Sequence, residues 1–285
     1  MVFDLAFVGG GIGSNSGLIN FLEKARIKNV KKKFTICVID EQIENIPGGI
    51  AYSKNLSISG FFNNPCRLSP STFVKWCLIN KNKKKLINFL NNQKSLSFLQ
   101  WLKQNKSAFY QAKKLIDLGE VYFPRVFYSL FLEDQLIKEI KKINKNIKLF
   151  FLQSKIKGVK KKDNVFILKS HNKIIKFTGK YKGEKLVLEK KNFLNSKNIS
   201  AKNIFLSMGL PSPKKLVPKN VSKNKFYISD LYKEGGARNL LNLIEIKSKN
   251  NKCPTVHFLG AKAGFLESLP EIKQSIIKKK IKVKI

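Results

Sequence analysis

A run of glycines directly after a short apolar segment restricts the fold of this chain more than any other feature. The segment VGGGIGS (8–14) follows the apolar run FDLAFV (3–8) and precedes the helix-like stretch LINFLEKAR (18–26). A second β-branched run, FTICVID (34–40), comes after a basic turn. Strand, glycine turn, helix and strand in this order predict a βαβ unit, and therefore an α/β fold built on a Rossmann-type parallel sheet.

The glycine spacing is that of a turn that binds the phosphates of a dinucleotide. Gly9 permits the tight turn, and Gly11 leaves room for a pyrophosphate against the helix N-terminus, whose free N–H groups favour an anion. Ser14 stands at the third glycine position and is small enough for close packing of the helix on the strand. The candidate cofactor-binding residues of this turn are Gly9, Gly10, Gly11, Gly13 and Ser14.

An acid at the end of the second predicted strand strengthens the dinucleotide interpretation. Asp40 is placed to accept hydrogen bonds from the hydroxyls of an adenosine ribose. The alternative is a glycine-rich turn that binds another ligand, for instance S-adenosylmethionine. That ligand usually requires an acid among the last residues of the first strand, where Ala6, Phe7 and Val8 stand. The pattern therefore favours a dinucleotide.

The rest of the chain predicts a two-part organisation. Residues 1–212 are expected to form the dinucleotide-binding domain, with helices inserted at about 54–145, and residues 213–285 a linker and a partial second Rossmann unit. The elements predicted after residue 70 are helices over 71–118, one amphipathic helix over 126–143, a β-meander over 148–191, a buried strand over 203–209 that ends in Gly209, and strand, glycine turn, helix and strand over 255–285.

Four separated motifs resemble those of one known family. GGIAYS (48–53) is similar to a glycine–small–Tyr segment, and FFNNPCRLSPS (61–71) to a Leu-Asn-x-Pro-Ala-x-x-Met-Ser stretch. FPRVFYSLFL (123–132) is similar to a Pro-Arg-x-x-Tyr-x-x-Tyr-Leu segment, and SAKNIFLSMG (200–209) to a strand that usually ends Ala-Thr-Gly. Together they resemble the FAD/NAD(P)-binding flavoproteins that include urate-hydroxylase-type and aspartate-N-oxygenase-type monooxygenases.

The resemblance implies FAD as a tightly held cofactor, reduced by NADPH or NADH, with oxygen or another acceptor as the oxidant. Asn63, Arg67 and Arg125 lie within the motifs and become candidate binding residues, and Gly209 is expected to pass close to the dinucleotide. No catalytic side chain is predicted, because in a flavoenzyme the cofactor carries the redox chemistry. The function expected is that of a monooxygenase-like, FAD-dependent oxidoreductase.

The two arginines also stand out by composition. The chain contains only 4 Arg against 52 Lys, yet Arg67 and Arg125 both lie inside these motifs. A planar guanidinium binds a phosphate or carboxylate through two parallel hydrogen bonds, which a lysine ammonium cannot form. The alternative is that these arginines brace a loop or cap a helix.

The charge of the chain is strongly basic, with 56 basic against 18 acidic residues and a formal net charge of +38. Such a charge first indicates a nucleic acid or an anionic membrane as partner. However, Lys, Asn and Ile together fill 109 of the 285 positions, which is the composition that an AT-rich coding sequence produces. The lysines are spread along the whole chain, and no aromatic and basic RNA-binding motif accompanies them. We therefore expect a small-molecule substrate and no specific nucleic acid as partner.

This expectation is testable through the salt dependence of nucleic-acid binding. If the charge reflects composition alone, binding should be weak, indifferent to sequence and lost steeply between roughly 50 and 200 mM salt, because only phosphates are contacted. Filter binding of two unrelated oligonucleotides over that range measures the effect. Tight, sequence-selective binding at 200 mM salt would instead support a basic nucleic-acid-associated protein.

The C-terminal unit departs from the dinucleotide pattern. Lys262 stands at the position of the second glycine and Phe265 at that of the third, so both hinder the approach of a phosphate. A whole nicotinamide domain needs on the order of 100 residues. We therefore expect either a truncated or split protein that works with a separately encoded second domain, or an accessory layer on the flavin domain. The alternative function is that of a non-catalytic flavin- or nucleotide-binding remnant.

The cysteines bear on the compartment and on metal binding. Cys37, Cys66, Cys77 and Cys253 lie far apart without a Cys-x-x-Cys pair, which argues against a zinc site and for a reduced, cytoplasmic protein. No stretch reaches the roughly 18 apolar residues that a membrane span needs.

Overall fold

The computed structural model of the chain divides into two compact units. The first unit is Met1–Lys54 with Ser129–Pro211, and the second is Asn55–Tyr128 with Ser212–Ile285. The residues that the structure describes are 2–54, 60–62, 64–93, 95–143, 145–182, 185–194, 196–207, 209, 228, 236–250, 253–257, 272–273, 276–277 and 280–284.

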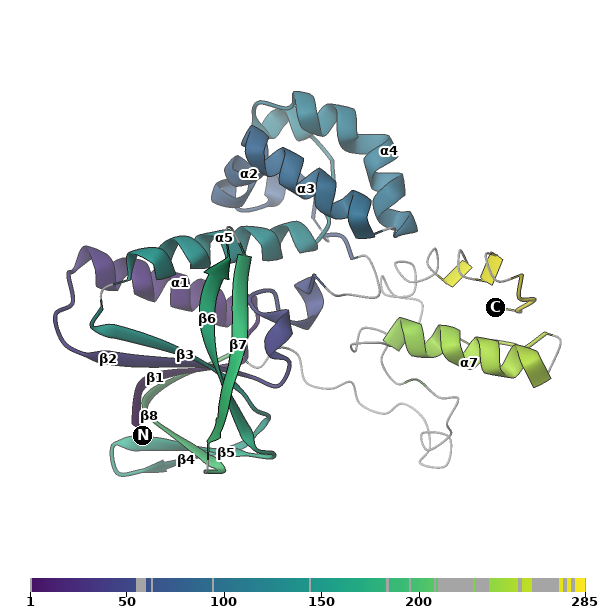
Figure 1. Cartoon of the computed structure of the whole chain (residues 1–285). Helices are drawn as coiled ribbons and strands as arrows, with labels where there is room; N and C mark the ends of the chain where they lie inside the picture. The colour runs from purple at the N-terminus through teal and green to yellow at the C-terminus, as the bar shows by residue number, and fades with distance from the viewer. Residues whose placement is uncertain are drawn as a thin grey trace. The chain divides into compact units, whose positions relative to one another are not determined.

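An eight-stranded sheet organises the first unit (Figure 1). The order of strands across it is β4-β5-β8-β1-β2-β3-β6-β7. Its strands are β1 (Val2–Val8), β2 (Phe34–Asp40), β3 (Ile147–Gln153), β4 (Ile156–Lys162), β5 (Val165–Ser170), β6 (Ile174–Lys182), β7 (Lys185–Leu194) and β8 (Asn198–Leu206). The helical segments of this part of the chain are α1 (Ile12–Ile27), η1 (Ile43–Asn45), η2 (Ile50–Tyr52) and α5 (Val126–Lys142).

Four of these strands, β8, β1, β2 and β3, run parallel and confirm the Rossmann-type sheet. At the end of β1, Val8 lies opposite Leu206 on one side and Ile39 on the other. The strand order reverses at β1, because the chain proceeds to β2 and β3 on one side and returns as β8 on the other. Ligands of open α/β sheets bind outside the carboxyl ends of the strands at such a reversal. The site is therefore expected where β1, β2 and β8 end.

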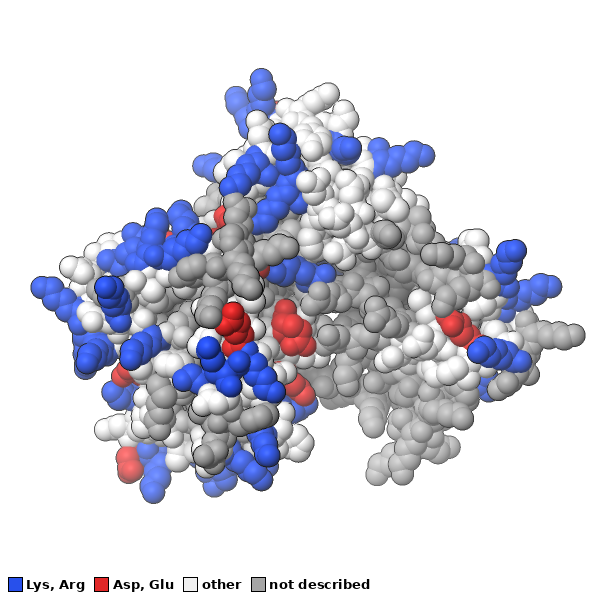
Figure 2. Space-filling model, in the orientation of Figure 1, with Lys and Arg blue, Asp and Glu red and all other residues white. Residues whose placement is uncertain are grey.

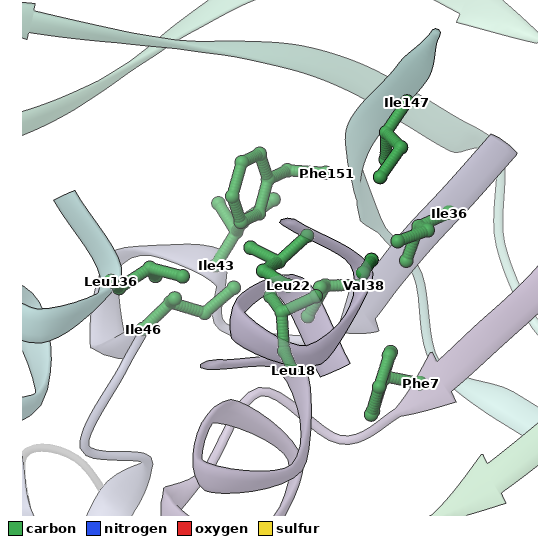
Figure 3. Close-up of a cluster of buried hydrophobic side chains, with 11 residues drawn as sticks. Phe7, Leu18, Leu22, Ile36, Val38, Ile43, Ile46, Leu136, Ile147 and Phe151 are labelled. Carbon is green, nitrogen blue, oxygen red and sulfur yellow. The ribbon is translucent and has the colours of Figure 1, made fainter. Parts of the chain in front are cut away.

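Both faces of the sheet are buried at the ends of β1 and β2, as the largely apolar sequences of these two strands predict. The neighbouring β8 is less covered, and its Phe205 and Leu206 are 41% and 50% exposed. On one face, α1 and α5 cover the sheet (Figure 1), and Leu18 and Leu22 of α1 pack beside Phe7 and Val38 (Figure 3). Each Leu, Val or Phe side chain that is fully buried in this way stabilises the folded state by about 1.5–3 kcal/mol relative to an exposed one. The buried members of this cluster are Phe7, Leu18, Leu22, Ala25, Ile36, Val38, Ile43, Ile46, Leu136, Ile147 and Phe151. The second cluster is Phe3, Ala6, Val8, Cys37, Ile39, Leu152, Leu168, Ile174, Ile199 and Ala201.

The region predicted as a β-meander over 148–191 forms β3 and two antiparallel hairpins at opposite edges of the sheet, and β5 and β6 are not neighbours. The β4–β5 hairpin pairs with β8, and the β6–β7 hairpin pairs with β3. β3 itself, whose sequence alternates like that of the hairpins, pairs parallel with β2 from Phe34↔Ile147 to Asp40↔Gln153. Alternation identifies strands, but the partner of a strand depends on which apolar faces meet in the folded chain.

Helices dominate the described residues of the second unit. These are η3 (Cys66–Leu68), α2 (Ser71–Leu78), α3 (Asn80–Gln93), α4 (Leu96–Gln111), η4 (Leu115–Leu118) and α7 (Gly236–Asn250). Aromatic rings fill the core of α2–α4: Trp101 lies edge-on to Phe109 and Phe127, and its Nε1 donates to the Tyr122 carbonyl at 2.8 Å. Trp101 is therefore a core residue.

A buried lysine caps the end of α4. Lys83 Nζ donates to the carbonyl oxygens of Tyr110 and Ala112, at 2.9 and 2.5 Å. Burial lowers the pKa of this ammonium, although nearby Asp117 acts in the opposite direction. Lys83 thus satisfies the last carbonyls of the helix, which have no partner within it.

Part of the predicted C-terminal unit is described. Thr255 and Lys284 form a parallel bridge, which is the pairing expected between the first and second strands of a βαβ unit. Lys262 and Phe265 lie outside the described residues. Along the described part of the chain, no helix has the length and apolar character that crossing a membrane requires.

Basic side chains are scattered over the face of the molecule that Figure 2 draws. The lysines and arginines on this face do not gather into one stripe, and acidic side chains are few. This distribution agrees with the compositional origin inferred for the charge.

Candidate functional site

The glycine turn leads from the end of β1 directly into α1. It lies at the carboxyl ends of the parallel strands, where β2 and β8 also end. Gly9 has a φ of 97°, a conformation that residues with a side chain rarely adopt. Its N–H donates to the carbonyl of Ile39 at 2.8 Å, so the turn starts in contact with the neighbouring strand. Gly9 therefore makes the tight turn out of β1.

The first turn of α1 lacks a side-chain cap. The helix begins after Gly11, and its first intrahelical bond runs from the N–H of Asn15 to the carbonyl of Gly11 at 3.0 Å. The structure describes all of α1. Its N-cap residue, Gly11, has no side-chain hydrogen bond, and its first turn holds no acidic residue. The N–H groups and the helix dipole together make this end favourable for an anion.

Glycine stands at positions 11 and 13 of the turn for different reasons. A Cβ built at Gly13 would lie 2.5 Å from Oγ of Ser207, so packing on the end of β8 explains that glycine. At Gly11 the atom nearest to such a Cβ is the Cα of Gly49, at 3.8 Å, which is an ordinary van der Waals distance. Gly11 also has a φ of −80°, which any residue adopts. The protein itself does not require glycine at position 11, but a ligand that approaches the backbone would.

Close packing of α1 on the sheet involves more than the predicted Ser14. Ser14 is completely buried, and its Oγ has no hydrogen-bond partner among the described residues. One turn later, a Cβ at Gly17 would lie 3.3 Å from the Phe7 ring and 3.5 Å from the Phe205 ring. Gly13 and Gly17 therefore contribute to the close approach that the sequence predicted at Ser14.

Asp40 ends β2 with both carboxylate oxygens bonded to backbone N–H groups. Oδ2 accepts from Gly10, and Oδ1 accepts from Gln42 at 2.7 Å. Burial raises the pKa of this carboxyl, the two N–H bonds lower it, and neighbouring Glu44 and Glu41 raise it further. A carboxylate has about four acceptor positions, so two remain for the hydroxyls of a ribose. Asp40 therefore holds the glycine turn, a role that sequence reasoning missed, and its contact with a ribose stays a prediction.

A loop over residues 42–53 lies against the glycine turn and was absent from the predicted site. Gly49 has a φ of 64°, and a Cβ on it would lie 2.8 Å from the Cα of Gly11. Gly48 packs on α5, where a Cβ would lie 2.6 Å from Oγ of Ser129. The two glycines allow the backbone of the loop to approach the turn and the helix closely. Their adjacency in the sequence PGG (47–49) indicates a turn, but it does not identify the segment on which the turn packs.

Polar side chains hold this loop in shape. Asn45 donates from Nδ2 to Oε1 of Gln42 at 3.0 Å and accepts from the hydroxyl of Ser53. At the end of the loop, Lys54 Nζ lies 2.9 Å from Oε1 of Glu133 on α5. The Glu133 side chain is 4% exposed, so its charge is largely removed from water and relies on this partner.

One buried amide joins the loop to the turn. Asn15 donates from Nδ2 to the carbonyl oxygens of Gly10 at 2.6 Å, Gly11 at 2.9 Å and Pro47 at 3.1 Å. Nothing in the local sequence around Asn15 predicts this role, because Pro47 is 32 positions away.

Gly209 follows the carboxyl end of β8. Its φ is 70°. Two residues earlier, the N–H of Ser207 donates to the carbonyl of Val8 at 2.8 Å, so this segment runs beside the end of β1. The structure thus brings Gly209 to the strand ends where the glycine turn and Asp40 also lie.

The other predicted residues belong to the second unit or lie outside the described part. The Nε of Arg67 lies 2.6 Å from Oε1 of Glu120, and both side chains are exposed. The N–H of Arg125 donates to the carbonyl of Gly60 at 2.9 Å. Asn63 lies outside the described residues. Within the described residues no group of three His, Cys, Asp or Glu side chains is arranged to hold a metal ion.

The fold and the site together define a Rossmann-type dinucleotide-binding protein. The family model described as FAD-NAD(P)-binding matches residues 6–178, which are 173 of the 285 residues. The chain belongs to this FAD-NAD(P)-binding family. No curated protein matches the chain significantly.

The residues at the turn fit FAD. Gly11 leaves a space beside the backbone that packing does not require, and the uncapped start of α1 offers N–H donors for a pyrophosphate. Asp40 retains acceptor positions for a ribose. FAD is therefore the cofactor on which the family and the chemistry of the site agree.

Proposed function

We propose that this chain is a flavin-dependent oxidoreductase of the monooxygenase-like kind, whose FAD is reduced by NADPH or NADH and acts on a small-molecule substrate. The observation that carries the proposal is the uncapped glycine turn beside Asp40 within a region that matches the FAD-NAD(P)-binding family. The motifs similar to those of urate-hydroxylase-type and aspartate-N-oxygenase-type monooxygenases support the finer assignment.

Each predicted residue has a role in this proposal. The turn from Gly9 to Ser14 holds the pyrophosphate through the backbone N–H groups at its helical end, because those of Gly9 and Gly10 already bond to Ile39 and Asp40. Asp40 holds the ribose, and Gly209 passes close to the dinucleotide. Bound FAD supplies the redox chemistry, and the protein binds and orients it. Residues 1–212 form the FAD domain, with its helical insert at about 54–145, and residues 213–285 a partial second unit. Asn63, Arg67 and Arg125 remain candidate binding residues, the two arginines for a phosphate or a carboxylate.

The first test is whether the purified protein carries FAD. We expect absorbance near 450 nm, as a bound flavin gives, and release of FAD on denaturation. Added FAD should also raise the melting temperature of cofactor-free protein, because a ligand that binds only the folded state stabilises it. A rise with S-adenosylmethionine and none with FAD would contradict the proposal.

The same preparation separates the proposed enzyme from its alternative. Anaerobic mixing with NADPH or NADH should bleach the flavin band slowly and without saturation at millimolar nicotinamide, because Lys262 and Phe265 stand where the C-terminal pattern would have glycines. A protein that binds FAD tightly but is not reduced by either nicotinamide would support the alternative of a non-catalytic flavin-binding protein that needs a partner chain.

A further inference from the structure

The side chain of Asn15 is fully buried at the start of α1 and makes no contact with solvent. Its Nδ2 has three carbonyl oxygens within hydrogen-bond distance, those of Gly10, Gly11 and Pro47. Its Oδ1 accepts from no donor among the described residues. Three acceptors around one end of the amide require the nitrogen there. A buried acceptor without a donor lowers the stability of the folded protein. The presence of asparagine at position 15 is therefore better explained by the carbonyls that its Nδ2 holds in place.

The carbonyls that Asn15 holds determine where two N–H groups of the turn point. In a planar trans peptide the N–H points away from the carbonyl of the same peptide unit. Because the carbonyls of Gly10 and Gly11 turn toward Nδ2, the N–H groups of Gly11 and Ile12 turn away from it. These two N–H groups are the donors closest to the position where Gly11 lacks a side chain. Asn15 thus orients donors that the pyrophosphate would use.

The third bond holds the loop that lies on the turn. Pro47 immediately precedes Gly48 and Gly49, and a Cβ on Gly49 would lie 2.8 Å from the Cα of Gly11. The bond from Asn15 to the Pro47 carbonyl, at 3.1 Å, therefore joins the loop to the turn at the point where their backbones meet. One side chain fixes both the N–H groups and the backbone that lies beside them.

We infer that Asn15 is a positioning residue for the phosphate-binding turn. It holds the N–H groups of Gly11 and Ile12 in the orientation that receives a pyrophosphate and keeps the Pro47–Gly49 loop in register with them. The inference rests on the proposed binding of the FAD pyrophosphate at this turn. It adds to that proposal a side chain that does not touch the cofactor.

The test compares Asn15→Leu with a matched control. Leucine has a similar volume but no donor, so the carbonyls of Gly10 and Pro47 lose this bond and that of Gly11 keeps only the backbone N–H of residue 15. The control is Asn82→Leu, because Asn82 is also buried and donates from Nδ2 to a backbone carbonyl, that of Trp76 at 2.8 Å, in the second unit. Affinities for FAD, ADP and adenosine are measured by calorimetry well below the melting temperature of each variant. ADP and adenosine differ in the pyrophosphate that the turn is proposed to hold.

We expect Asn15→Leu to weaken the binding of FAD and ADP by at least 10-fold and to leave that of adenosine unchanged. Asn82→Leu should lower the melting temperature without changing any of the three affinities. If Asn15→Leu does not fold, Asn15→Ser, whose single hydroxyl cannot reach all three carbonyls, provides the same comparison.

Two results would overturn the inference. Unchanged affinity for FAD and ADP in a folded variant would show that the turn keeps its orientation without Asn15. An equal loss for adenosine and ADP would show that Asn15 supports the site only through general packing. Failure of the wild-type protein to bind either FAD or ADP is a distinct result, which would remove the cofactor site itself and the inference with it.

Discussion

Gly11→Val should lower the affinity for FAD by about 100-fold, equivalent to about 2.7 kcal/mol, while the cofactor-free protein stays folded. The reason is that a Cβ at Gly11 meets no protein atom nearer than 3.8 Å, but stands where a pyrophosphate approaches the backbone. Gly11→Ala adds only the Cβ and should have a smaller effect of the same sign. Calorimetric titration with FAD and the melting temperature of cofactor-free protein measure the two properties separately.

Gly158→Val provides a matched control for that prediction. Gly158 lies in β4, and a Cβ there meets nothing within 4 Å, so the same change is made in open space away from the turn. Both the affinity for FAD and the melting temperature should stay close to those of the wild-type protein. Unchanged affinity in Gly11→Val as well would show that the phosphates bind elsewhere.

Asp40→Ala should cost about 1–3 kcal/mol of affinity for FAD, because it removes the acceptors for the ribose hydroxyls. The carboxylate also accepts the N–H groups of Gly10 and Gln42, so its loss loosens the turn itself. A variant with unchanged affinity would show that Asp40 serves only to hold the turn. Asp163→Asn, in the β4–β5 turn, is the control for the loss of one acidic charge.

The binding of FAD should weaken as the pH falls into the acid range. Burial raises the pKa of Asp40 above 3.8 in the cofactor-free protein, and hydroxyl donors from a ribose would lower it in the complex. Between those two pKa values the complex binds fewer protons than the free protein, so its affinity rises with pH and levels off above the higher value. Asp40→Asn cannot titrate and should show no such dependence beyond that of the cofactor.

The stability of the cofactor-free protein should respond to Asp40 in the opposite sense. Because the folded protein holds this proton more tightly than the unfolded chain, the contribution of Asp40 to the free energy of unfolding is largest at low pH. That contribution declines as the pH rises through the raised pKa. The difference in unfolding free energy between the wild-type protein and Asp40→Asn, measured from pH 4 to 7 by denaturant titration, isolates it from other carboxylates.

Local patterns in the sequence were sufficient to predict the βαβ unit and the long helix that the structure has as α5. Residues 3–40 contain a strand, a glycine turn, a helix and a strand within one short stretch, and each element depends on neighbours along the chain. The conformation of Gly9 and the position of Asp40 at the end of β2 follow from the same stretch. These features were predictable because backbone preference and hydrophobic periodicity act over a few residues.

The tertiary structure alone decided which distant residues complete the turn. Asp40 accepts from Gly10 across 30 positions, and Asn15 donates to Pro47 across 32. The pairing of Arg67 with Glu120, across 53 positions, was equally hidden, because the sequence offers a loop-bracing arginine only as an alternative and does not identify its partner. Sequence patterns report local preferences, whereas these contacts exist only because chain folding brings separate backbone segments within hydrogen-bond distance. That is why the glycine turn was predictable, while the loop against it and the amide that joins them were not.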